Sequence, residues 1–503
     1  MMLMEVLAME LTEVTKLRRE VLTRLSKYTF EGTLLDKVYD ILYEVVTEDT
    51  PRYRCCVHKE RAVLKNRICM ALGLKTGINI IEASKIALVE PVDRSLPIID
   101  VLSEACTQCP IEKYLVTDAC RHCIAHKCMN SCPKKAISIH LNRAYINKNE
   151  CIECGKCKSV CPFGAIIEIS RPCERACALD AIHPGVNHKA ELDRTKCVEC
   201  GSCRSACPFG AIDERSSIVQ LIQTIKSGKQ VVAMLAPSFI AQFGVKVTPG
   251  QILAGLLKMG FAEVTEVAAG ADMTVIHEAE EFLAKVPAEQ AFMTNSCCPA
   301  FVELIHKHLP ELADKISTTV SPMVACGEMV KALNPEAVTV FIGPCIAKKV
   351  EGRQYPEAID FVLTYEEIAC MLAGANIVLS TMPDKPFVSI ASKLGNGFPL
   401  FQGVGKAVAA TVATMTGRQV KATYCAGLVE CREALQKLNQ GELDADYFEG
   451  MSCLRGCIDG PGALVDAGIS RVFMTKFLSA VSQENATNNE LAQAALSKVK
   501  MER

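Results

Sequence analysis

Two adjacent cysteines, Cys297 and Cys298, stand directly before a proline in the string TNSCCPAF. The geometry of a disulfide fits badly across one peptide unit, so neighbouring cysteines are more often two thiols with different roles. Two later strings, GPCIAKK and EGMSCLRGCIDGPG, add Cys345, Cys453 and Cys457. With Cys298, these three cysteines make a set of four thiolates, the number that a 4Fe–4S cluster requires. A cluster gathered from distant segments lies inside a domain, which favours an active site over an electron relay.

Sixteen of the 28 cysteines lie in the segment that runs from Cys106 to Cys207. Two strings in it, CIECGKCKSVCPFGAI from Cys151 and CVECGSCRSACPFGAI from Cys197, share the spacing C-x2-C-x2-C-x3-C-P. In this spacing, three close thiolates bind one 4Fe–4S cluster, and the fourth, before the proline, binds the neighbouring cluster. The repeated PFGAI indicates a compact ferredoxin-like unit that is used more than once.

This sharing rule predicts three accessory clusters and leaves four cysteines over. The predicted ligand sets are Cys120, Cys123, Cys128 and Cys161; Cys151, Cys154, Cys157 and Cys132; and Cys197, Cys200, Cys203 and Cys177. The remaining cysteines are Cys106, Cys109, Cys173 and Cys207. Whether Cys106 and Cys109 complete a fourth cluster stays open, because a lone C-x2-C pair is a weak signal. A zinc ribbon is the alternative for such pairs, and the two complete ferredoxin strings argue against it.

Composition narrows the class of protein. The chain of 503 residues is 50% hydrophobic and carries a formal net charge of -2, so we expect no general attraction to nucleic acid or anionic membranes. We find no run of 18 or more apolar residues that would span a membrane, and the first residues lack the pattern of a secretory signal. Dense cysteine in a reducing compartment favours metal binding over disulfides. We therefore expect a cytoplasmic iron–sulfur protein.

Four segments are expected along the chain. Residues 1–103 place apolar residues at helical spacing and predict a helical region, and residues 104–214 form the ferredoxin-like multi-cluster domain. In residues 215–480, the apolar runs QVVAMLAP, AVTVFIGPC, DFVLTY, PFVSIAS and ISRVFMT alternate with amphipathic helical stretches. This alternation predicts an α/β domain with largely parallel strands, whose carboxyl ends carry the reactive residues. Residues 481–503 read as a polar tail with a short helix at most. The fold class is thus a multidomain combination of α+β and α/β parts.

The three strings TNSCCPAF, GPCIAKK and EGMSCLRGCIDGPG, in this order after ferredoxin motifs, resemble the signature motifs of the iron-only (FeFe) hydrogenases. The resemblance covers roughly residues 115–470 and looks closest to the divergent branch called group B. The active site of that family, the H-cluster, joins a 4Fe–4S cluster through one cysteine sulfur to a two-iron subsite with CO, cyanide and azadithiolate ligands. The resemblance implies that Cys298, Cys345 and Cys453 bind the 4Fe–4S cluster. It implies that Cys457 binds it as well and bridges to the two-iron subsite.

Residues around the two-iron subsite follow from the same resemblance. Lys348 would contact a cyanide ligand through charge-assisted pairing, although a surface lysine is the ordinary alternative. The family's packing loop is matched by Pro237 and Ser238, which could also be a plain strand end, and Met451 is retained before the third cysteine motif. The family usually has Trp at the position of Phe301; changes of this kind tune a metal site more than they alter its ligands.

A proton path is also implied. Cys297 would relay protons, because a thiol with a pKa of roughly 8.5 passes a proton in either direction near neutral pH. Two glutamates in TVIHEAEEFLAK stand three residues apart on one helical face, with a solvated helix face as the alternative interpretation. The matching positions give the path from Cys297 to solvent as Glu278, Ser317 and Glu281.

The implied activity is a ferredoxin-dependent FeFe hydrogenase that interconverts two protons and two electrons with H2. Its cofactors would be the H-cluster and three to four accessory 4Fe–4S clusters. Its partners would be a ferredoxin or similar one-electron carrier and the hydrogenase maturation proteins, with no nucleic acid and no membrane. The alternatives are an H2 sensor, or an iron–sulfur assembly or electron-transfer protein without the two-iron subsite. Retention of Cys297 and Lys348 argues against an assembly protein, because a simple 4Fe–4S site needs neither.

Overall fold

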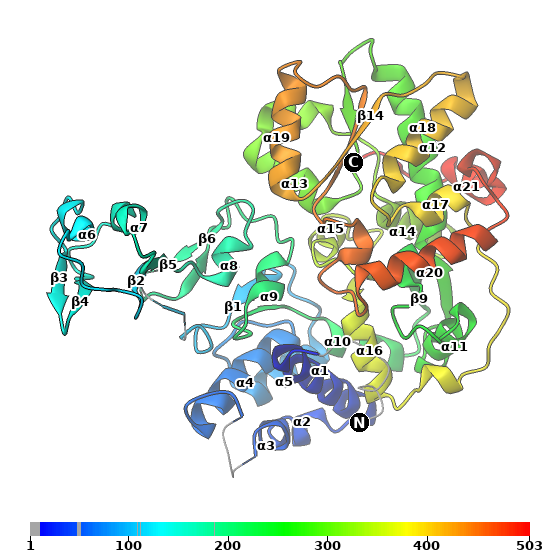
Figure 1. Cartoon of the computed structure of the whole chain (residues 1–503). Coiled ribbons are helices and arrows are strands. Elements are labelled where there is room, and N and C mark those ends of the chain that lie inside the picture. The colour runs from blue at the N-terminus through cyan, green and yellow to red at the C-terminus, as the bar shows by residue number, and fades with distance from the viewer. Residues whose placement is uncertain (1–10, 48–51, 108, 111, 186) are drawn as a thin grey trace.

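The computed structural model describes residues 11–47, 52–107, 109–110, 112–185 and 187–503. The interpretation that the first residues form no secretory signal falls partly on residues 1–10, which lie outside these ranges. Figure 1 shows an α/β region, residues 215–480, with N-terminal helices against one side of it and the cysteine-rich segment extending away. The fold is a multidomain mixture of helices and strands, as predicted. Within the described ranges, every helix is too short or too polar to cross a lipid bilayer.

The N-terminal region consists of helices that pack on the α/β region. They are α1 (Glu13–Glu31), α2 (Leu34–Lys37), α3 (Asp40–Val45), α4 (Val57–Ala71) and α5 (Ile80–Val89). Helix α1 is capped at Thr12, whose hydroxyl accepts a hydrogen bond from the Thr15 N–H, and it ends at Gly32 in the left-handed conformation. Its buried face packs against α16 (Tyr365–Gly374), so the two regions share an interface.

The cysteine-rich segment forms two small lobes in line. The distal lobe, residues 112–170, contains β2 (Tyr114–Val116), α6 (Lys127–Asn130), β3 (Ile137–His140), β4 (Arg143–Ile146), α7 (Lys156–Val160) and β5 (Ile166–Glu168). The proximal lobe, residues 171–214, contains α8 (Pro172–Arg175), β6 (Ile182–Pro184), β7 (Ala190–Leu192), α9 (Ser202–Ala206) and β8 (Ile212–Glu214), which pairs with β1 (Ile99–Val101). Gly155 and Gly201 precede α7 and α9 with φ of 73° and 89°, which a side chain would disfavour. The same turn therefore opens the corresponding helix of each repeat.

The α/β region contains two parallel sheets. The first runs in the order β10 (Glu263–Glu266), β9 (Val231–Leu235), β12 (Val338–Gly343) and β13 (Phe361–Thr364). The second runs in the order β11 (Met293–Thr294), β15 (Tyr447–Met451) and β14 (Ala422–Ala426). Every pair within these two sheets is parallel, which confirms the predicted strand direction.

Helices surround both sheets and fill the space between them (Figure 1). Besides α16, they are α10 (Ile218–Lys226), α11 (Pro249–Met259), α12 (Val267–Lys285), α13 (Pro299–His308), α14 (Pro322–Leu333), α15 (Lys348–Gln354), α17 (Lys393–Gly397), α18 (Gly403–Thr416), α19 (Leu428–Asn439) and α20 (Ala467–Ala480). Helix α12 contacts α14 on one side and α18 on another, and most of its residues are buried. Most side chains on α12 are therefore held inside the protein.

Two of the five apolar runs do not form the predicted strands. QVVAMLAP, AVTVFIGPC and DFVLTY contain β9, β12 and β13, but PFVSIAS is an irregular segment and ISRVFMT belongs to α20. The side chain of Asp466 accepts a hydrogen bond from the Gly468 N–H at 2.7 Å and caps α20 at its start. A short apolar run cannot by itself distinguish a strand from a helix, and here the cap at Asp466 favours the helix.

Residues 481–503 are not separate from the α/β region. They contain η5 (Ala486–Asn488) and α21 (Glu490–Leu496), which contact α12. Further on, the Val320 N–H donates to the Met501 carbonyl at 2.8 Å, and Thr319 forms an antiparallel bridge with Glu502. The expectation of one short helix agrees with α21, but the end of the segment pairs with residues 318–320, where Met501 is buried and Glu502 and Arg503 are exposed.

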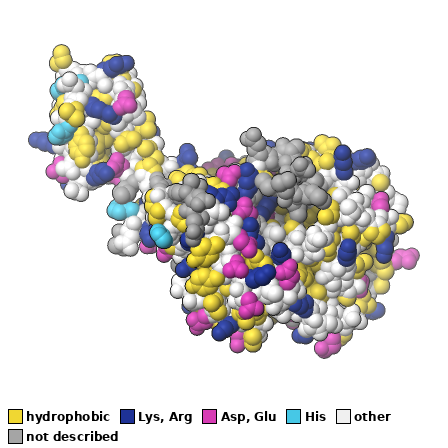
Figure 2. All heavy atoms as spheres, turned by 90° about the horizontal axis from the view of Figure 1, so that it is seen from below, with side chains coloured by type: hydrophobic (Ala, Val, Ile, Leu, Met, Phe, Trp, Pro, Cys, Tyr) yellow, Lys and Arg dark blue, Asp and Glu magenta, His cyan; other side chains and the backbone are white. Residues whose placement is uncertain are grey.

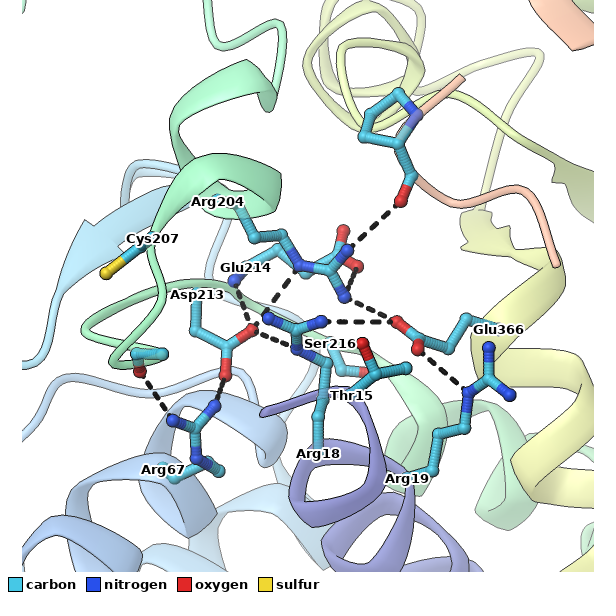
Figure 3. Close-up of polar contacts among 12 residues, drawn as sticks. Thr15, Arg18, Arg19, Arg67, Arg204, Cys207, Asp213, Glu214, Ser216 and Glu366 are labelled. Carbon is cyan, nitrogen blue, oxygen red and sulfur yellow. Dashed lines mark hydrogen bonds and ion pairs between the residues drawn. The ribbon is translucent and has the colours of Figure 1, made fainter. Parts of the chain in front are cut away.

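A buried charged junction lies where the N-terminal region, the proximal lobe and the α/β region meet (Figure 3). Arg18 of α1 and Arg67 of α4 both donate to Asp213 of β8, and the distance from Arg18 Nε to Asp213 Oδ1 is 2.9 Å. Arg204 of α9 donates to Glu366 of α16 at 2.5 Å. Burial alone would raise the pKa of Asp213, but the guanidiniums of Arg18, Arg67 and Arg204 outweigh burial and hold it well below its ordinary range. Charges of both signs from three regions thus neutralise one another in the interior.

Candidate active site

The carboxyl ends of three parallel strands bring the cysteine strings together. Cys297 and Cys298 follow β11, and Cys298 immediately precedes α13. Cys345 lies two residues beyond β12, and Cys453 lies two residues beyond β15. Cys457 begins a short 3-10 turn after that strand. The predicted position of the reactive residues at strand ends is therefore what the structure shows.

Gly456 allows the loop between the last two cysteines to close tightly. Its φ is 82°, and a Cβ there would lie 2.5 Å from the Pro399 carbonyl oxygen. A side chain would be strained in both respects, so glycine is required for this path. The turn brings Cys457 close enough to Cys453 for the charge of its thiolate to raise the pKa of Cys453.

The thiols of the four predicted ligands influence one another. Burial is the largest effect on each and raises the pKa of Cys345 to about 12. The charge of Cys298 raises the pKa of Cys345 and Cys457 further, and Cys345 raises that of Cys453. Four partly buried thiolates at one place are stable only with compensating positive charge, which the irons of a cluster supply. The donor set therefore fits the 4Fe–4S part of the H-cluster.

The cysteines of the first and the third predicted accessory sets lie close to one another. One cavity in the distal lobe is lined by all four cysteines of the first set, and in the proximal lobe Cys197, Cys200 and Cys177 each raise the pKa of Cys203. The four left-over cysteines lie near one another. The charges of Cys106 and Cys207 raise the pKa of Cys109, and those of Cys207 and Cys109 raise the pKa of Cys173. Ligation itself stays a prediction. In the described ranges, no three or more Cys, His, Asp or Glu side chains are placed to hold a single metal ion.

One hydrogen bond repeats through both lobes. The sulfur of a cysteine accepts from the backbone N–H of the alanine four residues later, at 3.3 or 3.4 Å. The pairs are Cys132 and Ala136, Cys161 and Ala165, Cys177 and Ala181, and Cys207 and Ala211. Hydrogen bonds to cluster sulfurs are among the factors that set reduction potentials. The repeat seen in the sequence as PFGAI is thus a repeated sulfur environment, which also extends to Cys132 and Cys177.

Cys297 lies beside Glu278 and close to two of the predicted ligands, Cys298 and Cys457, whose charges also raise its pKa. The Asn295 side-chain amide donates to the Cys297 sulfur at 3.3 Å, and the charge of Glu278 raises the Cys297 pKa after burial, the larger cause. Glu278 is fully buried, which raises its pKa to about 8. The Tyr447 hydroxyl donates to Glu278 Oε1 at 2.8 Å, while Glu278 Oε2 has no hydrogen-bond partner in the described structure. A carboxyl with such a pKa can both accept and donate a proton near neutral pH.

The outer part of the predicted proton path lies at the end of α12. The Ser317 hydroxyl donates to Glu281 Oε2 at 2.6 Å, and Lys285 pairs with Glu281 Oε1 at 2.7 Å. Burial alone would raise the pKa of Glu281, but these partners and Thr318 outweigh burial and lower it to about 2. Glu278 and Glu281 are 0% and 9% exposed, so the alternative of a solvated helix face is wrong. No described hydrogen bond joins Glu278 to Ser317, and that step stays a prediction.

Lys348 reaches the same place from α15. Its ammonium donates to the Cys297 carbonyl at 3.1 Å and to Glu351 Oε2 at 2.5 Å. Burial alone would lower its pKa, but the Glu351 carboxylate outweighs burial and raises it above the ordinary value. A buried, charged lysine at this position excludes the surface alternative.

The three packing residues are all buried. Pro237 and Ser238 lie in η1 (Pro237–Phe239), directly after β9, and the Ser238 hydroxyl lies 2.8 Å from the Tyr365 hydroxyl. Met451 ends β15 and is 2% exposed. Tyr365 is close enough to Cys457 for the thiolate charge to raise its pKa. The loop after β9 is thus packed toward the cysteine site.

Asn295, Glu351 and Tyr447 also belong to this site but were not among the residues expected from the sequence. Glu351 follows Lys348 by one helical turn, which is a usable signal for an ion pair. Asn295 precedes the cysteine pair but carries no spacing rule. Tyr447 meets Glu278 across 169 positions of sequence, so nothing local indicates the contact.

A family model for the "Iron only hydrogenase large subunit, C-terminal domain" matches residues 229–461, and a "4Fe-4S binding domain" model matches residues 144–167 and 190–213. The chain is 29% identical over 398 residues to the periplasmic [Fe] hydrogenase large subunit of Nitratidesulfovibrio vulgaris, covering 68% of this chain and 91% of that protein. It is 27% identical over 364 residues to the NADP-reducing hydrogenase subunit HndD of Solidesulfovibrio fructosivorans, covering 62% and 55%.

Two further similarities are more limited. The cytosolic Fe-S cluster assembly factor NAR1 of Kluyveromyces lactis is 30% identical over 95 residues, which covers 18% of this chain and 20% of that protein. A solved structure of the [FeFe]-hydrogenase HydA(deltaEFG) has a TM-score of 0.48 and 20% identity, covering 56% and 93%. The cysteine strings, the parallel strands that carry them and the two family models lead to one conclusion: the α/β region is similar to the iron-only hydrogenase large subunit, and the cysteine-rich segment carries two matches to the 4Fe–4S binding domain.

Proposed function

We propose that the protein is an FeFe hydrogenase of the group B branch that interconverts two protons and two electrons with H2 in the cytoplasm. The observation that carries this proposal is the meeting of four cysteines with Cys297, Glu278 and Lys348 at the strand ends. The H-cluster, inserted by maturation proteins, would supply the two-electron chemistry at this site. The residues of the chain hold it, screen it from water and move protons to it.

Each group of residues has one task. Cys298, Cys345 and Cys453 would hold the 4Fe–4S part, and Cys457 would hold both it and the two-iron subsite. Lys348 stays charged because Glu351 pairs with it, so it offers a positive charge to an anionic cyanide. The buried residues that exclude water around the subsite are Pro237, Ser238 and Met451.

Protons move on the side of the site that faces α12. Cys297 is the first group, and its thiol exchanges a proton with the unpartnered oxygen of Glu278. Ser317 and Glu281, bonded to each other, complete the path to Lys285 at the end of the helix. In this path the Glu278 carboxyl, whose pKa is about 8, is the proton carrier next to Cys297.

Electrons enter through the lobes. Cys200 of the proximal lobe is close enough to Cys453 to raise its pKa and packs on the same hydrophobic cluster as Cys298 and Cys345. At the far end, Ile124 is 97% exposed beside the first set of cysteines. The distal lobe carries nine Lys and Arg against five Asp and Glu, and Figure 2 shows hydrophobic and basic side chains together on its surface. Such a surface fits an acidic, ferredoxin-type carrier.

The carrier surface can be tested by charge reversal. Arg121 and Lys127 line the cavity of the first cysteine set, and changing both to Glu should raise the KM for an acidic ferredoxin by roughly tenfold and weaken its salt dependence. H2 formation driven by a viologen dye should be unchanged. Lys258→Glu, on exposed α11 surface, is the control and should alter neither rate. An unchanged ferredoxin KM in the double variant would place carrier binding elsewhere.

Infrared spectroscopy of anaerobically matured protein tests the function itself. CO and cyanide stretching bands that shift under H2 and vanish in Cys457→Ala are the expected result. Iron-loaded protein without these bands after maturation would contradict the proposal. That outcome would favour the second candidate, an iron–sulfur assembly or electron-transfer protein without the two-iron subsite, which the NAR1 similarity supports. An H2 sensor would show the bands but little turnover.

A further inference from the structure

The end of the described chain runs directly behind the two adjacent cysteines. Its backbone pairs with residues 318–320: the Val320 N–H donates to the Met501 carbonyl at 2.8 Å, and the Arg503 N–H donates to the Thr318 carbonyl at 2.9 Å. Met501 is 5% exposed, so this pairing is anchored in the core. The strand-like contact fixes the direction in which the Arg503 side chain leaves the backbone.

The Arg503 guanidinium points at the backbone of the cysteine turn. Its Nη2 donates to the Ser296 carbonyl, and its Nε donates to the Thr319 carbonyl at 3.4 Å. From the other side, the Lys348 ammonium donates to the next carbonyl, that of Cys297, at 3.1 Å. Two cationic side chains from segments 155 positions apart therefore hold consecutive carbonyls of one turn.

Glu351 connects the two cations. Its Oε2 accepts from Lys348 at 2.5 Å and from the Ser321 hydroxyl at 3.0 Å, and its Oε1 lies 3.8 Å from Arg503 Nη2. Glu351 is 2% exposed, and a buried carboxylate of this kind needs cationic partners. The same carboxylate thus neutralises both groups that hold the turn, and the three side chains form one unit.

We propose that Arg503 is a positioning residue: with Lys348 and Glu351 it holds the peptides of residues 296–298, so that the Cys297 thiol faces Glu278 and the Cys298 thiol faces the cluster site. Fixing two successive carbonyls removes the freedom of the intervening peptide, which sets the direction of both side chains. Small displacements at such a place have large effects on reactions. Only the consequence for proton relay rests on the proposed function; the hold on the turn does not.

Hydrogen exchange of the unmatured protein tests the hold on the turn without any cofactor. Arg503→Met keeps a long side chain but removes the donors, and exchange in peptides covering residues 294–302 should rise by at least about fivefold as local opening becomes easier. Arg503→Lys, which keeps the charge and loses the forked geometry, should give a smaller rise. Lys498→Met, on the exposed part of the same tail, should leave these peptides unchanged.

Matured protein gives a second readout that a purely structural role would not move. In Arg503→Met the cyanide stretching bands and the pH profile of H2 formation should shift, and Arg503→Lys should restore part of both. Exchange at residues 294–302 equal to that of the unaltered protein, in a folded Arg503→Met variant, would overturn the proposal. If Arg503→Met does not fold, Arg503→Lys becomes the test. A rise in its exchange at residues 294–302 would support the proposal, and unchanged exchange would overturn it. Absence of CO and cyanide bands in the unaltered protein would instead contradict the proposed function alone.

Discussion

Glu278→Gln should lower the rate of H2 formation by about 10²- to 10³-fold while the infrared bands of the H-cluster persist. Glu278 is fully buried, its Oε1 accepts a hydrogen bond from Tyr447, and its Oε2 is unpartnered within the described structure. Glutamine preserves this shape and the bond from Tyr447 but cannot take up and release a proton. Loss of rate with an intact cofactor would therefore identify a proton-transfer step.

The raised pKa of Glu278 also predicts how stability and rate change with pH. Burial raises the Glu278 pKa from an ordinary 4.5 to about 8, so the group is mainly neutral at pH 7 and becomes anionic above pH 8. The folded state holds the proton more tightly than the unfolded state. The contribution of this group to stability is therefore complete below pH 4.5 and is lost as the pH rises toward 8. In Glu278→Gln, both this loss and the limb of the rate profile near pH 8 should disappear.

Viologen-driven H2 formation, with infrared spectra of the same samples, is the measurement. Glu280→Gln is the matched control, because Glu280 lies on the same helix but is exposed, and its rate should equal that of the unaltered protein. Tyr447→Phe should shift the limb near pH 8 without abolishing it, since it removes a hydrogen bond and leaves the carboxyl. A Glu278→Gln variant with full rate would show that protons take another route.

Asp213→Asn should have the largest effect on stability. The change removes the carboxylate that neutralises Arg18 and Arg67 at the charged junction (Figure 3), and loss of one partner of a buried ion pair costs about 3–5 kcal/mol. The pKa of Asp213 is held below its ordinary 3.8, so the stabilisation is present above pH 3.8 and is lost as the pH falls below it. At neutral pH the full effect should appear.

Hydrogen exchange locates this loss. In Asp213→Asn, exchange should rise in α1 and α4, and the apparent Tm should fall, because the N-terminal region is held through the junction. The control is Asp118→Asn, which removes a pair with Arg143 at 2.6 Å whose Asp118 side chain is 96% exposed. Exposed pairs contribute about 0–1 kcal/mol, so that variant should resemble the unaltered protein. Equal effects in the two variants would show that the junction does not stabilise the fold.

Local patterns predicted the parts of this structure that depend on local geometry. Ferredoxin spacing groups three cysteines within one short loop and takes the fourth from the neighbouring motif, so the first cysteine set could be assigned from sequence and does line one cavity. The alternation of strands and helices predicted parallel sheets and placed Cys345 at a strand end. These inferences needed only spacing and periodicity.

Other features depend on contacts between distant segments. ISRVFMT has the composition of a strand, but capping by Asp466 and packing make it part of α20. The polar tail gave no sign that Arg503 would reach Ser296, 207 positions away. The contact of Tyr447 with Glu278 has the same origin. Such contacts exist only after the chain has folded, and no periodicity in the sequence encodes them.

The distal lobe stands clear of the rest of the molecule, whereas α12 lies in the α/β region away from it (Figure 1). Under the proposed function, electrons and protons then reach the active site by different routes, electrons through the distal lobe and protons beside α12. A large carrier can dock and leave at the lobe without covering the place where protons enter. Supply of electrons and supply of protons would then respond to independent influences, carrier concentration for one and bulk acidity for the other.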